Sequence, residues 1–110
     1  MALGDSYAAG VGAGGKNDKN TEITDFDKCC LRSTKAYSFI VNKKLQCNYF
    51  ISRACSGASV AGSDGNTIYH QLPGFEGVYD LITVTVGGND IDFAAIAEKC
   101  IVQYLSLIHI

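Results

Sequence analysis

The stretch DLITVTVGGND (Asp80–Asp90) decides the fold class of this 110-residue chain. Its first seven residues are nearly all apolar or β-branched, which is typical of a strand buried on both faces of a parallel sheet. The run stops at Gly87-Gly88, and the residues from Asp92 onward (DFAAIAEKCIVQYL) predict a helix. The stretch therefore predicts one strand–helix unit of an α/β protein.

Two earlier parts of the chain carry strand-like residues. Residues 1–4 have the character of the last residues of a strand, and residues 49–54 (YFISRA) form a short β-prone run. Between them we expect a helix that begins at a Ser33 or Thr34 cap and continues to about Gln46. Its apolar residues recur every three or four positions, as on a helix face that packs on a sheet: Tyr37, Ile40, Val41 and Leu45.

The remaining segments are expected to be a loop and a short helix. Residues 14–29 are polar, contain glycine and have no sustained period, which predicts a surface loop. Residues 67–72 predict a short helix that ends at Pro73-Gly74. Strands and helices thus alternate along the chain, and this order favours an α/β fold with a parallel sheet.

Small or polar residues follow each of the three expected strands. The sequence reads GDS at Gly4–Ser6, CSGA at Cys55–Ala58 and GGND at Gly87–Asp90. In parallel sheets, ligands bind outside the carboxyl ends of the strands. We therefore expect these three stretches to gather at one edge of the sheet and to form the functional site.

Composition limits the possible partners. The chain is long enough for one domain with a modest core; 47% of its residues are hydrophobic, 18% are charged, and the net charge is -2. Basic residues are scattered, so no nucleic-acid partner is expected. No apolar run approaches the roughly 20 residues of a membrane span. Met1 is followed at once by the first predicted strand rather than by a secretory signal, so we expect either that the protein is cytoplasmic or that its true N-terminus is missing.

The cysteine count points to an oxidising compartment. Five cysteines are a high density for a chain of this length, and cytosolic proteins seldom carry so many without a metal site. Cys29-Cys30 is not a C-x-x-C knuckle, and neither His70 nor His109 stands at ligand spacing from a cysteine pair. We therefore expect no metal and no cofactor.

The opening stretch GDSYAAGVGAGG admits two chemistries. Gly10, Gly12 and Gly15 spell G-x-G-x-x-G, a phosphate-binding pattern, but its first glycine should stand directly at the strand end, several residues earlier. Alternatively, Ser6 is a nucleophile at the junction of a strand and a helix, where its hydroxyl and its own N–H face the same space. A helix N-cap is the plain structural role for the same serine.

Two further residues complete the hydrolytic interpretation. The Asn89 side chain is placed to donate to an oxyanion, and Gly57 can offer a backbone N–H without a side chain in the way. Each also has a purely structural alternative. Asn89 and Asp90 are candidate caps of the following helix, and Gly57 is a candidate turn residue.

Taken together, GDSYAAG, CSGA and VGGND resemble the first three conserved blocks of the SGNH hydrolase superfamily, the GDSL lipases and esterases. The chain is most similar to the secreted, disulfide-containing branch of actinomycetes and fungi. That branch has a C-x-R-S-x-x-x-Y segment between the first two blocks, matched here by Cys30, Arg32, Ser33 and Tyr37. The resemblance extends from Ala2 to Gln103.

This resemblance implies a three-layer α/β/α flavodoxin-like sandwich with a parallel sheet, of which these residues supply about the first three strands. It implies hydrolysis of carboxylic esters through an acyl-enzyme on Ser6. The oxyanion hole would comprise the Ser6 and Gly57 amides and the Asn89 side chain. Asp5 would hold the loop in shape. From its position before the next helix, we expect Asp90 to support the site as a cap of that helix.

The resemblance also assigns the cysteines. Cys30 and Cys55 match a family disulfide, and Cys100 matches a cysteine whose partner lies further along the family's sequence. Cys29 and Cys47 have no counterpart, and we expect that they can pair with each other.

The family's D-x-x-H block is missing, because His70 follows Thr67 at that spacing and His109 follows Ser106. We therefore expect residues 1–104 to be the N-terminal part of one hydrolase domain, inactive without its base. Residues 105–110 are expected to be a non-native or frayed tail, or alternatively the end of the helix from Asp92.

We expect a secreted monomer that acts on a small-molecule or lipid ester and does not insert into membranes. The alternative functions are a non-catalytic lipid- or carbohydrate-binding remnant of the fold and, with less support, a nucleotide-binding domain.

Overall fold

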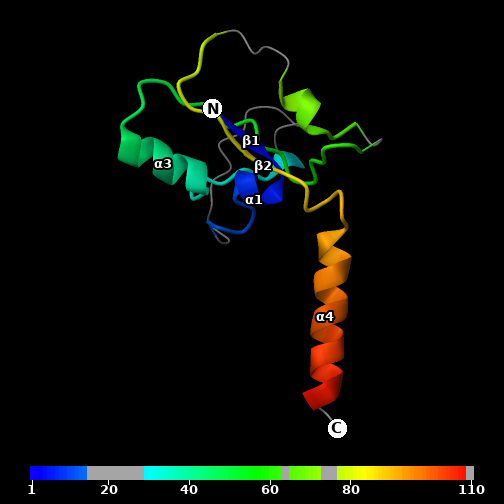
Figure 1. Ribbon diagram of the computed structural model, residues 1–110. Helices are drawn as coiled ribbons and strands as arrows, with labels where there is room; N and C mark the ends of the chain where they lie inside the picture. The colour runs from blue at the N-terminus through cyan, green and yellow to red at the C-terminus, as the bar shows by residue number, and fades with distance from the viewer. Residues whose placement is uncertain (15–28, 63–64, 73–76, 109–110) are drawn as a thin grey trace.

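The computed structural model describes residues 1–14, 29–62, 65–72 and 77–108 (Figure 1). Most of the expected loop at 14–29, as well as Pro73-Gly74, lies outside the described residues. The elements occur in the order β1 (Ala2–Gly4), α1 (Ser6–Ala9), α3 (Tyr37–Leu45), the 3₁₀ helix η2 (Ile68–Gln71), β2 (Thr83–Thr85) and α4 (Phe93–Ile108).

The sheet is parallel, as predicted. β1 and β2 pair in register, with Ala2 opposite Thr83 and Gly4 opposite Thr85. Residues 51–55 run beside β1 through backbone hydrogen bonds, although only one bridge, between Ala2 and Ser52, is regular. The predicted strand at 49–54 is therefore an extended segment rather than a full strand. The described residues form a small α/β structure consistent with an incomplete flavodoxin-like fold.

β2 differs from its prediction in burial. The continuous apolar run predicts a strand covered on both faces, yet Val84 is 53% exposed, and Leu81 and Ile82 are exposed as well. The regular strand has only three residues, and β1 is the single described strand that pairs with it. Its apolar side chains are exposed because no described element covers them.

α3 begins later than predicted. Its N-cap is Ala36, because Ser33 uses its Oγ to accept a hydrogen bond from the Lys35 N–H in a local turn. The predicted core-facing side of this helix is also wrong in part, since Ile40 and Leu45 are exposed. Of the four apolar residues predicted for this face, Tyr37, at the start of the helix, is the one that packs against the described core cluster.

The core is small and is made of small side chains. Ala8 and Ala9 of α1 lie against Ala54, and Tyr37 packs at the margin of this cluster. Alanine methyl groups bury little area, so close approach of backbones replaces interdigitation of large side chains. Gly10 serves this packing, because a Cβ at that position would lie 2.7 Å from the Ala36 Cβ.

α4 stands away from the rest of the molecule (Figure 1). It is the longest described helix, with 16 residues, and it continues to Ile108, which corresponds to the helical alternative for residues 105–108. Within the described part of the chain, no helix has the length and apolar character needed to cross a membrane.

Candidate active site

The turn from β1 into α1 sets the position of Ser6. Asp5 is buried and caps α1 by accepting a hydrogen bond from the Tyr7 N–H at 3.0 Å. Its own N–H donates to the Thr85 carbonyl at 2.9 Å, which joins the ends of the two strands. Asp5 is therefore the N-cap, and the alternative that Ser6 caps the helix is wrong.

Ser6 is the first residue of α1 and is half-buried. The first N–H groups of a helix have no partner inside it, and the Ser6 amide donates no hydrogen bond to any described residue. No described residue hydrogen-bonds its hydroxyl either. The hydroxyl and the amide are thus both available at the carboxyl end of β1.

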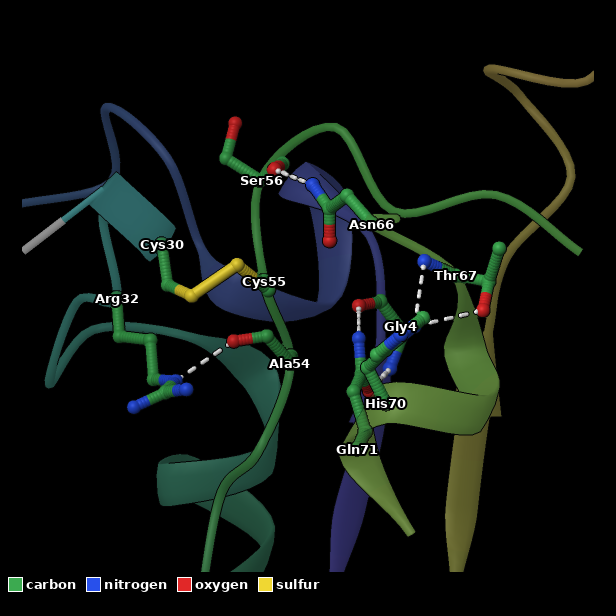
Figure 2. The surroundings of a disulfide bond; sticks show 10 residues. All are labelled: Gly4, Cys30, Arg32, Ala54, Cys55, Ser56, Asn66, Thr67, His70 and Gln71. Atoms are coloured by element: carbon green, nitrogen blue, oxygen red, sulfur yellow. Dashed lines mark hydrogen bonds between the residues drawn. A yellow bond between two sulfur atoms is a disulfide. The ribbon is translucent and has the colours of Figure 1, made fainter. Parts of the chain in front are cut away.

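Gly4 precedes this turn in a conformation that excludes side chains. Its φ is +139°, and a Cβ there would lie 2.1 Å from the Thr85 carbonyl oxygen. Gln71 binds both backbone groups of Gly4, donating from Nε2 to the carbonyl at 2.7 Å and accepting from the N–H at 2.8 Å (Figure 2). Sequence reasoning missed Gln71, because nothing in its local pattern indicates a partner 67 residues away.

The second stretch is held against the end of β1. The Cys55 N–H donates to the Gly4 carbonyl at 2.9 Å, and Cys55 forms a disulfide with Cys30, the pair that the resemblance implies (Figure 2). Gly57 has a φ of +82°, a left-handed conformation that favours glycine. Its N–H makes no hydrogen bond to the described residues.

The segment between these two stretches fixes their arrangement. Arg32 donates from Nε to the Ala54 carbonyl at 2.6 Å, beside the disulfide (Figure 2). The Tyr37 hydroxyl lies 3.1 Å from Thr85 Oγ1, at the end of β2. We call the sheet edge formed by Gly4–Ser6, Cys55–Ala58 and Gly87–Asp90 the site edge. The C-x-R-S-x-x-x-Y segment thus contacts this edge on two sides.

Asn89 connects the third stretch to the second. Its Nδ2 donates to the Ala58 carbonyl at 2.8 Å. A primary amide carries two N–H groups, so one remains for another acceptor, and the first fixes the orientation of the side chain. The stretches at Gly4–Ser6, Cys55–Ala58 and Gly87–Asp90 are therefore linked to one another by hydrogen bonds.

Asp90 does not cap α4, contrary to the prediction. Its carboxylate accepts hydrogen bonds from the N–H groups of Val60, at 2.9 Å, and Ala61, at 3.0 Å. These two donors lower the pKa of Asp90 from its ordinary value. α4 begins at Phe93, three residues after Asp90. The Asp90 side chain instead anchors the backbone at Val60 and Ala61, which follows the second stretch.

His70 bonds to Thr67, the N-cap of its own short helix. Its Nδ1 lies 3.0 Å from Thr67 Oγ1 and accepts from the Thr67 N–H at 3.4 Å, which forms a capping box for η2. His109 lies outside the described residues. Among the described residues, no histidine is bonded to Ser6.

The expected pairing of Cys29 with Cys47 is not formed. Both residues are exposed and neither is in a disulfide. Cys47 follows the far end of α3, a helix about 13 Å long by its nine residues, whereas Cys29 adjoins the buried Cys30. The helix therefore carries Cys47 away from Cys29. Cys100 is exposed and free.

The phosphate-loop alternative does not fit the geometry. α1 lies between β1 and the glycines, and Gly10 is the C-cap of that helix rather than the start of one. A dinucleotide fingerprint needs its glycines between the strand end and a helix N-terminus. The nucleotide-binding interpretation is therefore wrong for the described part of this stretch; Gly15 lies outside it.

Two further observations bear on possible ligands. A groove of about 320 Å³ is lined by Met1, Leu81 and Thr83, and so lies at the starts of the strands, away from Ser6. In the described ranges, no group of three or more His, Cys, Asp or Glu side chains is placed to hold a metal ion.

Comparison with known proteins agrees with this geometry. Residues 2–110 match the GDSL-like lipase/acylhydrolase family. Over 103 residues, 94% of the chain, the sequence is 36% identical to a lipase of Streptomyces rimosus and 34% identical to lipase 1 of Streptomyces coelicolor. The chain spans about a third of the length of each of these relatives. No solved structure matches the chain. The chain belongs to the GDSL-like lipase/acylhydrolase family.

Proposed function

We propose that these residues form the nucleophile and oxyanion side of a serine hydrolase that acts on carboxylic esters. The observation that carries the proposal is the position of Ser6, half-buried at the end of β1 with its hydroxyl and amide unbonded to the described residues. The name "lipase" given to both Streptomyces relatives supports an ester as the substrate class.

In the proposed reaction, Ser6 Oγ attacks the ester carbonyl carbon while a base takes the hydroxyl proton. The carbonyl oxygen becomes an oxyanion, and the C–O bond to the alcohol then breaks to leave an acyl group on Ser6. Water attacks the acyl carbon, and the acid and the free Ser6 hydroxyl are released. The proton taken by the base passes to the departing alcohol.

Three donors would stabilise the oxyanion. The Ser6 amide stands at the start of α1, where the helix dipole also favours negative charge. The Gly57 amide stands in a turn with no side chain of its own, and the second N–H of Asn89 is free of the bond to Ala58. Preorganised donors of this kind are a large source of catalysis in acyl transfer.

The base is proposed to come from polypeptide outside these 110 residues. Within the described residues, His70 is engaged with Thr67, and the chain has no D-x-x-H sequence. A serine without its base loses most of its reactivity, although the oxyanion donors retain some catalysis. We therefore propose that the 110-residue chain alone is inactive or nearly so.

The disulfide supports a secreted protein. Disulfides persist in oxidising compartments and are rare in the cytosol, and Cys30–Cys55 joins two segments of the site edge. We propose export as the setting in which this bond forms.

The function is tested in a chimera in which residues of this chain replace the aligned 103-residue stretch of the S. rimosus lipase. We expect the chimera to hydrolyse p-nitrophenyl esters, and Ser6→Ala to lower the rate at least about 1,000-fold. Ser38→Ala is the matched control, because Ser38 is buried in α3 and its Oγ has no partner among the described residues. That variant should keep the full rate.

Covalent labelling separates the alternatives. A fluorophosphonate should label Ser6 in the chimera and leave the Ser6→Ala variant unlabelled. A chimera that binds lipid or sugar but neither reacts with the probe nor hydrolyses esters would instead make the chain a non-catalytic binding remnant. Hydrolysis by the 110-residue chain alone that depends on Ser6 would contradict the proposed inactivity.

A further inference from the structure

A second groove, beside residues 51–55, carries two guanidinium groups. Its volume is about 370 Å³, and its lining includes Arg32 and Arg53 together with His70 of η2. None of the proposed oxyanion donors, Ser6, Gly57 and Asn89, lines it. We call this feature the arginine groove, and it is separate from the proposed oxyanion hole.

The lining of the arginine groove is basic, although the chain as a whole has a net charge of -2. No aspartate or glutamate among the described residues lines it. Arg32 and Arg53 are both half-buried, and charges that are partly buried are screened by salt less than charges at the open surface. A groove with two such positive charges attracts anions.

The Cys30–Cys55 disulfide brings the two arginines to one place. Arg32 stands two residues after Cys30, and Arg53 stands two residues before Cys55. Arg32 Nε donates to the Ala54 carbonyl at 2.6 Å, which fixes the plane of its guanidinium (Figure 2). The Arg53 N–H donates to the carbonyl of the first residue of β1 at 2.8 Å. The backbone and the disulfide therefore hold the groove in shape before a ligand arrives.

Two uncharged side chains add hydrogen-bond donors to the groove. His70 Nδ1 accepts from the Thr67 N–H at 3.4 Å, so the proton of the neutral ring is on Nε2, which is a donor. Ser52 also lines the groove, and its buried Oγ has no hydrogen-bond partner among the described residues. An anion oxygen would accept from this hydroxyl and remove the cost of a buried polar group without a partner.

The number and directions of these donors indicate which anion fits. A guanidinium presents a planar fork, so a carboxylate, with one charge and two oxygens in one plane, is matched by a single arginine. A phosphate monoester carries a charge of about -1.5 to -2 at pH 7 and three acceptor oxygens that point in different directions. Two guanidiniums with further donors from Ser52 and His70 match the phosphate better.

We propose that the arginine groove is a binding site for a phosphate group. The group belongs either to a soluble phosphate ester or to the head group of a lipid, since both present the same oxygens. The site stands on the lining residues and is independent of the proposed ester hydrolysis.

Titration of the 110-residue chain with inorganic phosphate, followed by NMR, tests the site. The imidazole signals of His70 are the local readout, and they should move with saturation. We expect Arg53→Gln to weaken phosphate binding at least about tenfold, because charge-assisted hydrogen bonds are lost. Lys43→Gln is the matched control, since it removes the same charge from an exposed position of α3 and should change the affinity less than about twofold.

A second variant separates the loss of a ligand contact from a loss of folding. Arg53→Lys keeps the positive charge and lacks the planar fork, so its affinity should lie between those of the parent chain and Arg53→Gln. Misfolding of Arg53→Gln would instead displace amide signals throughout the chain in the absence of phosphate. Arg53→Lys that binds no better than Arg53→Gln would contradict a charged contact with the phosphate.

Two further probes distinguish the sources of the phosphate group. Glycerol 3-phosphate presents it in solution, and vesicles of phosphatidylcholine with phosphatidic acid present it at a surface. Cosedimentation with these vesicles, but not with phosphatidylcholine alone, that Arg53→Gln abolishes would assign the groove to a lipid head group. Arg53-dependent binding of glycerol 3-phosphate without cosedimentation would assign it to a soluble ester.

Three results would overturn the proposal. The first is the absence of an Arg53-dependent movement of the His70 signals with phosphate. The second is an equal loss of affinity in Lys43→Gln, which would show a general effect of charge. The third is binding of acetate as tight as that of phosphate, which would make the groove a carboxylate site. All three are measurements of binding, so none depends on Ser6 or on ester hydrolysis.

Discussion

Asn89 is fixed by one hydrogen bond and is proposed to act through another. Its Nδ2 donates to the Ala58 carbonyl, so the amide cannot rotate freely before an ester arrives. A donor that is already held in place loses no further conformational freedom when the oxyanion forms. Its hydrogen bond therefore stabilises the transition state more than the bound ester. Asn89 therefore has two roles: it links two stretches of the site edge through the Ala58 carbonyl, and it is proposed to donate its second N–H to the oxyanion.

We expect Asn89→Ala in the chimera to lower kcat by about 100-fold or more and to change KM little. Steady-state kinetics with p-nitrophenyl butyrate measures both constants. Asn89→Asp is the second variant, because it keeps the shape and replaces the NH₂ group by an oxygen, so that both N–H donors are lost. A kcat unchanged in both variants would remove Asn89 from the oxyanion hole.

Asp90 makes the stability of the site edge depend on pH. The N–H of Val60, and then that of Ala61, lower the pKa of Asp90 below its ordinary value. The folded chain therefore takes up this proton at lower pH than the unfolded chain. The stabilisation is complete above the unfolded pKa of about 3.9 and is lost as the pH falls through the folded value.

A carboxyl-detected NMR titration checks this expectation. The Asp90 carboxyl should titrate below its value in the urea-unfolded chain, and the Val60 and Ala61 amide resonances should move with the same midpoint. Asp90→Ala should abolish that movement. Titration of Asp90 at or above the unfolded value would show that the two N–H bonds do not persist in solution.

Sequence reasoning predicted the position of some residues at this sheet edge and missed others for physical reasons. Ser6, Gly57 and Asn89 lie beside strand ends, where a local pattern indicates position, and the structure links their segments. The clamp of Gln71 on Gly4 depends on a contact across 67 residues, which no local pattern carries. The role of Asp90 was wrong because its partners, 30 and 29 residues away, compete with the nearby helix end.

At the scale of elements, α1 is a short helix whose position depends on its cap. It has four residues, so propensity alone cannot sustain it, and the Asp5 carboxylate satisfies one of its free N–H groups. The backbone of Asp5 also bonds to Thr85. The element that carries Ser6 is thus fixed through Asp5 on two sides.

We expect Asp5→Ala to lower the free energy of unfolding by about 1–2 kcal/mol, measured by urea denaturation. Asp5→Asn keeps a capping oxygen and should lose much less. In the chimera, Asp5→Asn should hydrolyse ester at nearly the unchanged rate, since Asp5 is proposed to shape the turn. A loss of about 100-fold or more would instead indicate proton transfer by Asp5.

η2 is attached to β1 through one side chain. Gln71 is buried, accepts from the Gly4 N–H and shares the Gly4 carbonyl with the Cys55 N–H. Gln71→Met keeps the length of the side chain and should cost about 1–3 kcal/mol in urea denaturation, because the Gly4 N–H loses its partner while the Gly4 carbonyl keeps the Cys55 N–H. Tyr69→Phe, an exposed change in the same helix, should have almost no effect. Equal effects of the two variants would contradict the clamp.

The elements also separate what periodicity can and cannot predict. β1, the short helix at 67–72 and the helix from Asp92 were predicted because each has an unambiguous local signal. The start of α3 was wrong, because the Ser33 hydroxyl bonds inside its own turn instead of capping. The predicted burial of β2 was wrong. An apolar composition shows that a strand can be covered on both faces, but the covering depends on neighbouring elements, and no described element covers β2.

At the scale of the whole molecule, the disulfide joins parts that the small core holds weakly. Cys30 and Cys55 are separated by 25 residues and connect the segment before α3 to the site edge. A disulfide stabilises a protein mainly by lowering the conformational entropy of the unfolded chain. Because the core is built from alanines, we expect this effect to be a large share of the free energy of unfolding. The sequence resemblance implies this pair, whereas spacing alone leaves several pairings open.

We expect the Cys30→Ser, Cys55→Ser double variant to lose about 3–4 kcal/mol of unfolding free energy, the entropy estimate for a loop of this length. Urea denaturation of both proteins measures the difference. Cys47→Ser is the control and should leave stability unchanged, since Cys47 is exposed and outside any disulfide. A double variant as stable as the parent chain would show that the small core suffices.

The conformation of Gly4 also has a consequence for inheritance. Every single-nucleotide missense change of a glycine codon encodes a residue with a Cβ, and at this position that atom would lie 2.1 Å from the Thr85 carbonyl oxygen. No missense change of a single nucleotide in this codon therefore encodes a residue that fits at position 4. The gene can drift at synonymous sites here, but the amino acid can change only together with a rearrangement of β2.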